Sequence, residues 1–183
     1  GVWDESSKKA TYKNRKPGQP FFHVQNHTVT HEGSLHFDQE AIDNTAEEDL
    51  EHIKVFPYHP DTKTFRYSYH HFQNRHVLAD QQMGKFIADL EDQGLMEDTV
   101  IFYFGDHGGV LPRSKGYAYE SGLRVPLVVY VPEKWKHLFH HSKGSRAETF
   151  VEFVDLAPTV LSLAGIPPSK GMDGTAVLGA YSE

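Results

Sequence analysis

The chain contains no cysteine, which excludes disulfide bonds, thiolate metal ligands and a cysteine nucleophile among its 183 residues. No apolar run approaches the roughly 20 residues that a membrane-spanning helix needs. We see no secretory signal peptide at the start of the chain. Because the sequence begins with Gly1 rather than Met, we interpret it as a fragment or a processed product.

Excess positive charge is also lacking. The formal net charge is −7, which argues against a general nucleic-acid binder, because such a protein needs clustered Lys and Arg facing the phosphates. Residues 1–19 form a polar lead-in segment, and we expect its basic side chains to be solvated. The apolar content of 38% suits a globular protein, and the length favours one domain.

Apolar runs predict strands at 20–26, 99–104 and 127–131, and the last two are expected to be buried. A helix is predicted over 66–94, because apolar residues recur there at three- and four-residue steps and Gly94 provides a typical end. A second helix is predicted from Asp155, with proline in its first turn and glycine at its close. Strands alternating with helices indicate an α/β layer fold.

Chemically capable side chains follow two of the predicted strands. Asp106 and His107 come directly after strand 99–104 and lie between glycines, while His31 follows strand 20–26. In open α/β sheets, ligands bind just beyond the carboxyl ends of strands. Lys115, in a Pro-Arg-Ser-Lys-Gly segment, is the fourth candidate. None of these residues is diagnostic alone.

In this order, the residues resemble the second half of a sulfatase of the alkaline phosphatase superfamily. The resemblance covers most of residues 18–178 and rests on several ordered motifs. These are Phe21-Phe22 followed by His31, Gly94-Leu95 at a helix end, Asp106-His107-Gly108, Lys115 followed by Tyr119 to Pro126, Asp155 with Pro158-Thr159 and Ala164-Gly165-Ile166, and Asp173-Gly174.

The resemblance implies an alkaline-phosphatase-like sandwich, with a mostly parallel central sheet flanked by helices and incomplete in this chain. It implies that Asp106 and His107 ligate a divalent metal, which in the family is typically calcium, and that His31 and Lys115 contact the sulfate group. This suits the chemistry, since cations stabilise the charge that develops on a sulfate ester. Ca²⁺ favours oxygen ligands, so Asp106 fits it better than His107 does. Glu120 and Arg124 are expected to be internal structural residues.

The family's formylglycine, made from the Cys or Ser of a Cys-x-Pro-x-Arg motif, has no counterpart in this chain, and neither does the family's first pair of metal-binding aspartates. We therefore interpret residues 1–183 as a single partial domain, the C-terminal part of a sulfatase catalytic domain, inactive alone. The parent protein is expected to hydrolyse carbohydrate or aryl sulfate monoesters to an alcohol and inorganic sulfate. Family members are commonly periplasmic, secreted or lysosomal.

Two alternatives stay open: a phosphatase, phosphodiesterase or phosphonate hydrolase of the same superfamily, and a non-catalytic binding fragment.

Several local patterns have simpler interpretations. His27 and His31 have the spacing of a zinc-binding helix, but the intervening Thr-Val-Thr favours extended chain. The acidic residues of 38–51 are expected to form a solvated face. His137, His140 and His141 are expected on a surface loop, with a metal-binding tract as the weaker alternative.

Overall fold

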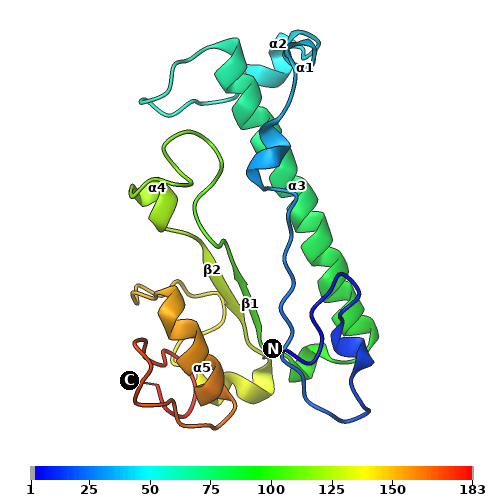
Figure 1. The fold of residues 1–183 in the computed structure, drawn as a ribbon, viewed down its shortest axis with the longest axis vertical. Coiled ribbons are helices and arrows are strands. Elements are labelled where there is room, and N and C mark those ends of the chain that lie inside the picture. The colour runs from blue at the N-terminus through cyan, green and yellow to red at the C-terminus, as the bar shows by residue number, and fades with distance from the viewer. Residues whose placement is uncertain (1–2, 183) are drawn as a thin grey trace. The chain divides into compact units, whose positions relative to one another are not determined.

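The computed structural model describes residues 3–182, which form two compact units. Unit 1 comprises residues 1–83 and 109–116, and unit 2 comprises residues 84–108 and 117–183. The boundary between them passes through one long helix, α3 (Figure 1). None of the helices within residues 3–182 is both long and apolar enough to cross a bilayer.

Unit 1 has its apolar core in two clusters beside α3 (Lys63–Asp92). Ile42 and Leu50, from the short helices α1 (Gln39–Asp43) and α2 (Glu47–Leu50), pack with Tyr67. The second cluster joins Ile53, Tyr69 and Leu111, so that residues from three distant parts of the sequence meet. Single turns of 3₁₀ helix occur at Tyr12–Asn14 (η1) and Glu32–Leu35 (η2).

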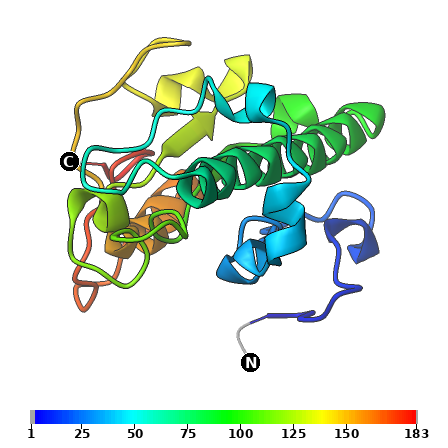
Figure 2. The same ribbon diagram turned by 90° about the horizontal axis from the view of Figure 1, so that it is seen from above.

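The predicted long helix is confirmed. α3 contains 30 residues and is continuous in both ribbon views (Figure 1 and Figure 2). It ends as expected, because Gly94 adopts a φ of 66° and the Leu95 N–H donates to the Leu90 carbonyl at 2.8 Å. Tyr69 and Leu90 on the predicted apolar stripe are buried, whereas His76 is exposed.

The strand predicted at 20–26 is wrong. These residues have no regular secondary structure and make no ladder with another segment of residues 3–182. The ring of Phe21 stacks on Tyr12 of η1 at 4.9 Å between centroids, and Phe22 stacks on Trp3 at 5.7 Å. Aromatic packing within the lead-in region therefore takes the place of strand pairing.

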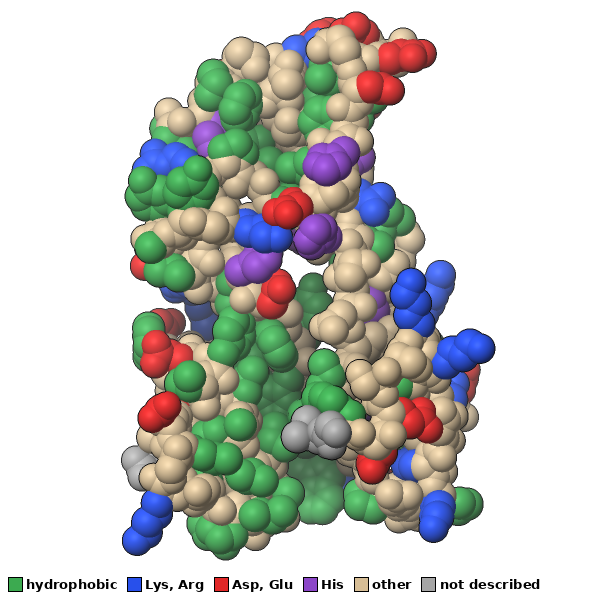
Figure 3. All heavy atoms as spheres, in the orientation of Figure 1, with side chains coloured by type: hydrophobic (Ala, Val, Ile, Leu, Met, Phe, Trp, Pro, Cys, Tyr) green, Lys and Arg blue, Asp and Glu red, His purple; other side chains and the backbone are tan. Residues whose placement is uncertain are grey.

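Unit 2 contains β1 (Ile101–Phe104) and β2 (Leu127–Tyr130), which confirms the other two strand positions. The strands pair antiparallel, with Ile101 opposite Tyr130 and Phe104 opposite Leu127. Thus residues 3–182 form a two-stranded antiparallel sheet and not the expected mostly parallel one. The expectation of buried strands is also wrong, because Tyr103 is 39% exposed and Val128 57%. Hydrophobic side chains gather on the surface in the part of Figure 3 where the strands and α5 lie.

The last helix, α5 (Leu156–Leu163), is confirmed and organises the C-terminal segment through buried polar side chains. Asp155 accepts hydrogen bonds from the N–H groups of Glu152 and Thr175, both at 2.9 Å. The Thr159 hydroxyl accepts from the Val177 N–H at 3.0 Å, and Ser162 accepts from Tyr181 at 2.8 Å. The Asp-x-x-Pro-Thr motif, together with Ser162, therefore holds residues 175–181 against α5.

Three shorter elements complete unit 2: η3 (Met96–Asp98), α4 (Glu120–Leu123) and η4 (Glu133–Leu138), with η5 (Phe153–Asp155) leading into α5. Glu120 and Arg124, expected to be internal, are exposed. Glu120 is the first residue of the single turn α4 and Arg124 is its C-cap, and the buried residue of this turn is Gly122. In this motif, the buried residue is therefore Gly122 and not Glu120 or Arg124.

Candidate functional site

His31 caps the 3₁₀ turn η2. Its Nδ1 atom accepts a hydrogen bond from the Gly33 N–H at 3.3 Å, and the backbone of His31 is extended, as an N-cap requires. With Nδ1 as the acceptor, the neutral ring carries its proton on Nε2. The local fold therefore fixes which nitrogen of this exposed imidazole can donate to a ligand.

A cavity of about 450 Å³ opens beside His31 in unit 1. Its wall combines residues around η2 with one residue of α3, and it is lined by Thr28, His31, Gly33, Ser34 and Arg75. No carboxylate belongs to this set, so the wall carries hydrogen-bond donors and positive charge. The sequence analysis missed Arg75 and Ser34.

Lys115 lies in the loop 109–116, which belongs to unit 1 and closes on itself. The Lys115 N–H donates to the Gly109 carbonyl at 2.9 Å, and Leu111 is buried in the second core cluster. The Lys115 ammonium forms an ion pair with Glu32 Oε2 at 2.9 Å. Since Glu32 directly follows His31, this pair brings the ammonium group to the segment that carries the imidazole.

A buried histidine holds the base of this loop. His59 Nε2 lies 3.0 Å from the Pro112 carbonyl oxygen, and its Nδ1 lies 2.7 Å from the Tyr69 hydroxyl. A carbonyl can only accept, so Nε2–H donates to it and Nδ1 accepts from Tyr69. The Tyr69 oxygen in turn accepts from the Phe56 N–H at 3.2 Å. Burial raises the pKa of Tyr69, which keeps this hydroxyl a donor.

The glycine-flanked pair lies in unit 2, just after β1. Gly105 N–H donates to Pro126 and Gly108 N–H to Gly122, so both glycines hold the turn against the segment that leads into β2. His107 Nδ1 lies 2.6 Å from the Gly108 carbonyl and therefore donates to it. This leaves the Nε2 of the neutral ring as a lone-pair donor, 3.8 Å from Asp106 Oδ1.

These two groups fit part of a metal site. The Asp106 side chain is 86% exposed, and the free nitrogen of His107 faces the same neighbourhood as the carboxylate oxygen. Within residues 3–182, no cluster of three or more His, Asp or Glu side chains could hold a metal ion. Because Ca²⁺ takes six to eight oxygen ligands, these two side chains alone would not complete a calcium site.

The structure thus brings the segment of His31 together with Lys115 in unit 1, and it places Asp106 beside His107 in unit 2. The convergence of all four groups on one anion stays a prediction.

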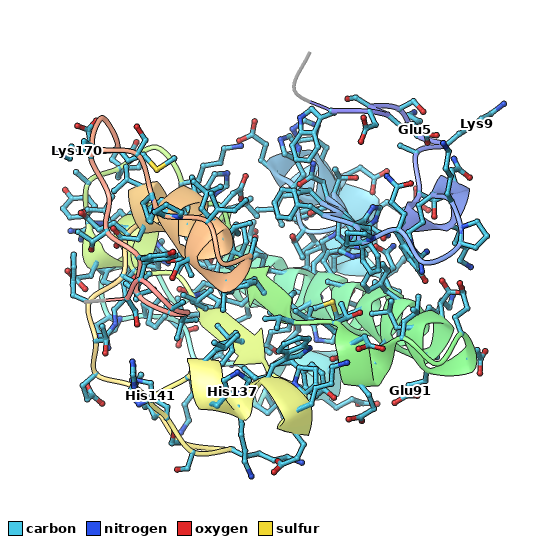
Figure 4. All side chains as sticks on the ribbon, turned by 90° about the horizontal axis from the view of Figure 1, so that it is seen from below. Glu5, Lys9, Glu91, His137, His141 and Lys170 are labelled. Carbon is cyan, nitrogen blue, oxygen red and sulfur yellow. The ribbon has the colours of Figure 1, made fainter. Side chains whose placement is uncertain are left out.

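His27 and His137, two of the other histidines, have hydrogen-bond partners within the chain. His27 Nδ1 bonds to the Gln82 side chain at 2.9 Å, which ties it to α3. His137 bonds to the Lys134 carbonyl at 3.1 Å, and the exposed residues His137 and His141 lie on the surface segment after β2 (Figure 4). In the lead-in segment, Lys9 is exposed and extends away from the ribbon (Figure 4), as expected for a solvated stretch.

Comparison with known proteins decides the family. The model of the Sulfatase family matches residues 2–166. The chain belongs to the sulfatase family. Family membership implies the alkaline-phosphatase-like α/β fold.

Curated relatives agree with this assignment. This sulfatase chain is 34% identical to an ulvan-active sulfatase of Formosa agariphila, in a match covering 98% of the chain and 35% of the relative. It is 33% identical to human N-sulphoglucosamine sulphohydrolase, over 52% of the chain and 18% of that protein. An arylsulfatase of Clostridium perfringens is 30% identical over 52% of the chain and 20% of its own length. The chain therefore spans about a third or less of the relatives it matches. No solved structure matches it significantly.

Proposed function

We propose that this chain is one partial domain, the C-terminal part of a sulfatase catalytic domain, and that its parent hydrolyses sulfate monoesters of carbohydrates or aryl alcohols. The observation that carries the proposal is the donor-rich cavity at His31, with the Lys115 ammonium fixed to the adjoining residue at 2.9 Å, in a member of the sulfatase family. The relative that covers nearly the whole chain is named for activity on ulvan, so ulvan is the first carbohydrate to test.

In this proposal, His31 and Lys115 bind the sulfate group. His31 offers its Nε2–H, because Nδ1 is engaged by Gly33. Charge develops on the sulfate oxygens and on the leaving oxygen during cleavage, and positioned donors stabilise it. The Lys115 ammonium adds a compact positive charge, and the imidazole can pass a proton to the leaving alkoxide.

Asp106 and His107 would hold a divalent metal, for which calcium is the family's usual choice. When bound, such an ion acts as a Lewis acid on a sulfate oxygen. His107 is prepared for ligation by its own backbone, since the bond from Nδ1 to Gly108 keeps Nε2 available. The attacking group, a formylglycine, is proposed to lie on further residues of the parent together with the remaining metal ligands. The larger, mostly parallel sheet of the family is likewise proposed to be completed there.

The test uses the full-length parent protein with 4-nitrophenyl sulfate, 4-nitrophenyl phosphate and ulvan as substrates. Replacing Lys115 with Ala is expected to lower kcat/KM for the sulfate ester by about 10²–10³-fold, as for the loss of an oxyanion donor. His31→Ala is expected to cost about 10²–10⁴-fold, as for a general acid. The exposed Lys9 provides the matched control, because Lys9→Ala removes the same charge far along the chain from both segments.

Each outcome has a distinct meaning. Faster hydrolysis of the phosphate than of the sulfate ester would favour a phosphatase-type enzyme over a sulfatase. If the parent cleaves sulfate esters but Lys115→Ala and His31→Ala behave like Lys9→Ala, the assignment of these two residues is wrong. Ligand binding without any hydrolysis, unaffected by either substitution, would favour the binding-fragment alternative. The 183-residue chain alone is expected to show no turnover.

A further inference from the structure

We propose that Arg75 binds a second anionic group of the substrate, next to the scissile sulfate, and so selects polyanionic carbohydrates. This inference rests on the proposed function, since it assigns a specificity role within the cavity that His31 lines. The ligand chemistry is an oxyanion, either a carboxylate or a second sulfate on a neighbouring sugar.

Arg75 is held in place by the segment that forms the other wall of the cavity. It lies on α3, and its Nε–H donates to the Val29 carbonyl at 2.7 Å, across 46 residues of sequence. A guanidinium has five N–H donors, and this anchoring bond uses one of them. The bond fixes the plane of a half-buried group, so the cavity wall presents an oriented fork and not a mobile surface cation.

The segment that carries His31 is tied to α3 through Ser34. The Ser34 hydroxyl is buried and has no hydrogen-bond partner within residues 3–182. Its backbone carbonyl is already engaged by His71 Nε2 at 2.7 Å, so the segment is fixed while the side-chain hydroxyl stays unsatisfied. Because the Ser34 hydroxyl oxygen has almost no accessible surface, a ligand in the cavity does not reach it, and the charged or ring N–H donors that the wall can offer are those of Arg75 and His31.

The chemistry of the wall selects an anion. Its members offer a guanidinium and an imidazole and contain no carboxylate. Glu32, the acidic residue that directly follows His31, forms an ion pair with Lys115. The planar fork of arginine matches the two oxygens of a carboxylate or sulfate in a bidentate contact.

The cavity is open to solvent and has room for more than one anionic group. Its volume of about 450 Å³ lies within the range of small-molecule sites. A sulfate group needs only a few times the roughly 30 Å³ that a water molecule takes in the liquid. The space is sufficient for a sugar unit that carries its own anionic group, with His31 at the scissile sulfate and Arg75 at the neighbouring charge.

The experiment compares two substrates on the full-length parent protein. One is a sulfated oligosaccharide with a carboxylated neighbouring sugar, and the other is 4-nitrophenyl sulfate, whose only anionic group is the scissile one. Arg75→Ala is expected to raise KM for the oligosaccharide about 10–100-fold, as for loss of a hydrogen bond to a charged group, with kcat within about threefold. For 4-nitrophenyl sulfate, kcat/KM is expected to change less than about threefold.

Two further variants separate binding from folding. Arg75→Lys keeps the charge but loses the fork, so it should restore KM for the oligosaccharide only in part. Arg66 is the matched control, because it lies on the same helix and pairs with Asp61 away from the cavity wall. Arg66→Ala should leave both substrates unaffected. Reducing the carboxylates of the oligosaccharide, or removing its second sulfate, identifies which anion Arg75 binds, since only the relevant change should abolish the effect of Arg75→Ala.

Two results would overturn the inference. An equal fall in kcat/KM for both substrates in Arg75→Ala would place Arg75 at the scissile sulfate itself. Unchanged kcat/KM for both substrates would show that Arg75 binds neither anion. Calorimetric titration of the oligosaccharide into wild-type and Arg75→Ala protein keeps the inference separate from the proposed function. A parent that cleaves no sulfate ester but binds the oligosaccharide about 10–100-fold more weakly in the variant would refute the proposed hydrolysis and retain the anion site.

Discussion

The histidine at the base of the Lys115 loop offers a direct test of how the proposed sulfate-binding lysine is positioned. His59 is 9% exposed and joins the Tyr69 hydroxyl to the Pro112 carbonyl. Phenylalanine would fill most of the same space without either hydrogen bond. His59→Phe would therefore leave the buried Tyr69 hydroxyl without its acceptor, at about 1–3 kcal/mol, and the part-buried Pro112 carbonyl without its donor, at about 1 kcal/mol.

The effect should be local, and the chain provides its own reporter. The Lys115 N–H donates to the Gly109 carbonyl at 2.9 Å, so its exchange with solvent requires the loop to open. A local loss of about 2–4 kcal/mol corresponds to roughly 30–1,000-fold faster exchange. Hydrogen exchange of the full-length protein, followed by mass spectrometry on peptides that cover 109–116, measures this directly.

Two comparisons make the result interpretable. Tyr69→Phe keeps the bond from His59 to Pro112 and removes only the hydroxyl, so it should accelerate exchange of the loop less than His59→Phe does. His137→Phe changes an exposed histidine of unit 2 and should leave the loop unchanged. If the Lys115 N–H of His59→Phe exchanges at the wild-type rate, or if exchange is accelerated equally throughout β1 and β2, His59 does not hold this loop.

Two other predictions concern unit 2. A Cβ at Gly174 would overlap the Val154 carbonyl, so Gly174→Ala should lower the free energy of unfolding by about 3 kcal/mol. Gly171 has only a distant contact at its Cβ position, so Gly171→Ala should change the free energy of unfolding by no more than about 0.5–1 kcal/mol. Equal urea midpoints for the two variants would contradict the close approach at Gly174. Asp106→Asn should weaken divalent-metal binding by the full-length protein at least about tenfold, measured as bound metal after dialysis, while Asp61→Asn should have no effect. Unchanged metal content in Asp106→Asn would remove this residue from the metal site.

The helices were predictable because their signals are local. The apolar stripe of α3 and the left-handed Gly94 act within a few residues of each other, and the structure places the helix over Lys63–Asp92. The same holds for α5, where Gly165 has a φ of 72° and the helix closes before it. Strands depend instead on a partner elsewhere in the sequence. Residues 20–26 have strand-like composition but no partner within the described chain, so they remain unpaired and without regular secondary structure.

In the candidate site, too, the local features were predictable from the sequence and the long-range contacts were not. The turn at Asp106 and His107 was evident from the glycines around it, but the pairing of Glu32 with Lys115 joins residues that are far apart in sequence and leaves no local pattern. Arg75 left a weak signal, since it lies three residues after Phe72 and four before Ala79 on the stripe side of α3. A guanidinium beside an apolar stripe requires polar partners, and the Val29 carbonyl and the polar cavity provide them.

Three features of the chain need groups that it does not contain, and the proposed parent domain accounts for all of them. Tyr103 and Phe104 are neighbours on β1 and therefore point to opposite faces of the sheet, yet both are more than a third exposed. A two-stranded sheet alone is marginally stable, so both faces need further layers. The Asp106–His107 pair needs more ligands, and the absence of cysteine leaves no formylglycine precursor in a Cys-x-Pro-x-Arg motif. A parent about as long as the ulvan-active sulfatase, of which this chain covers 35%, would have room for further strands, metal ligands and a nucleophile.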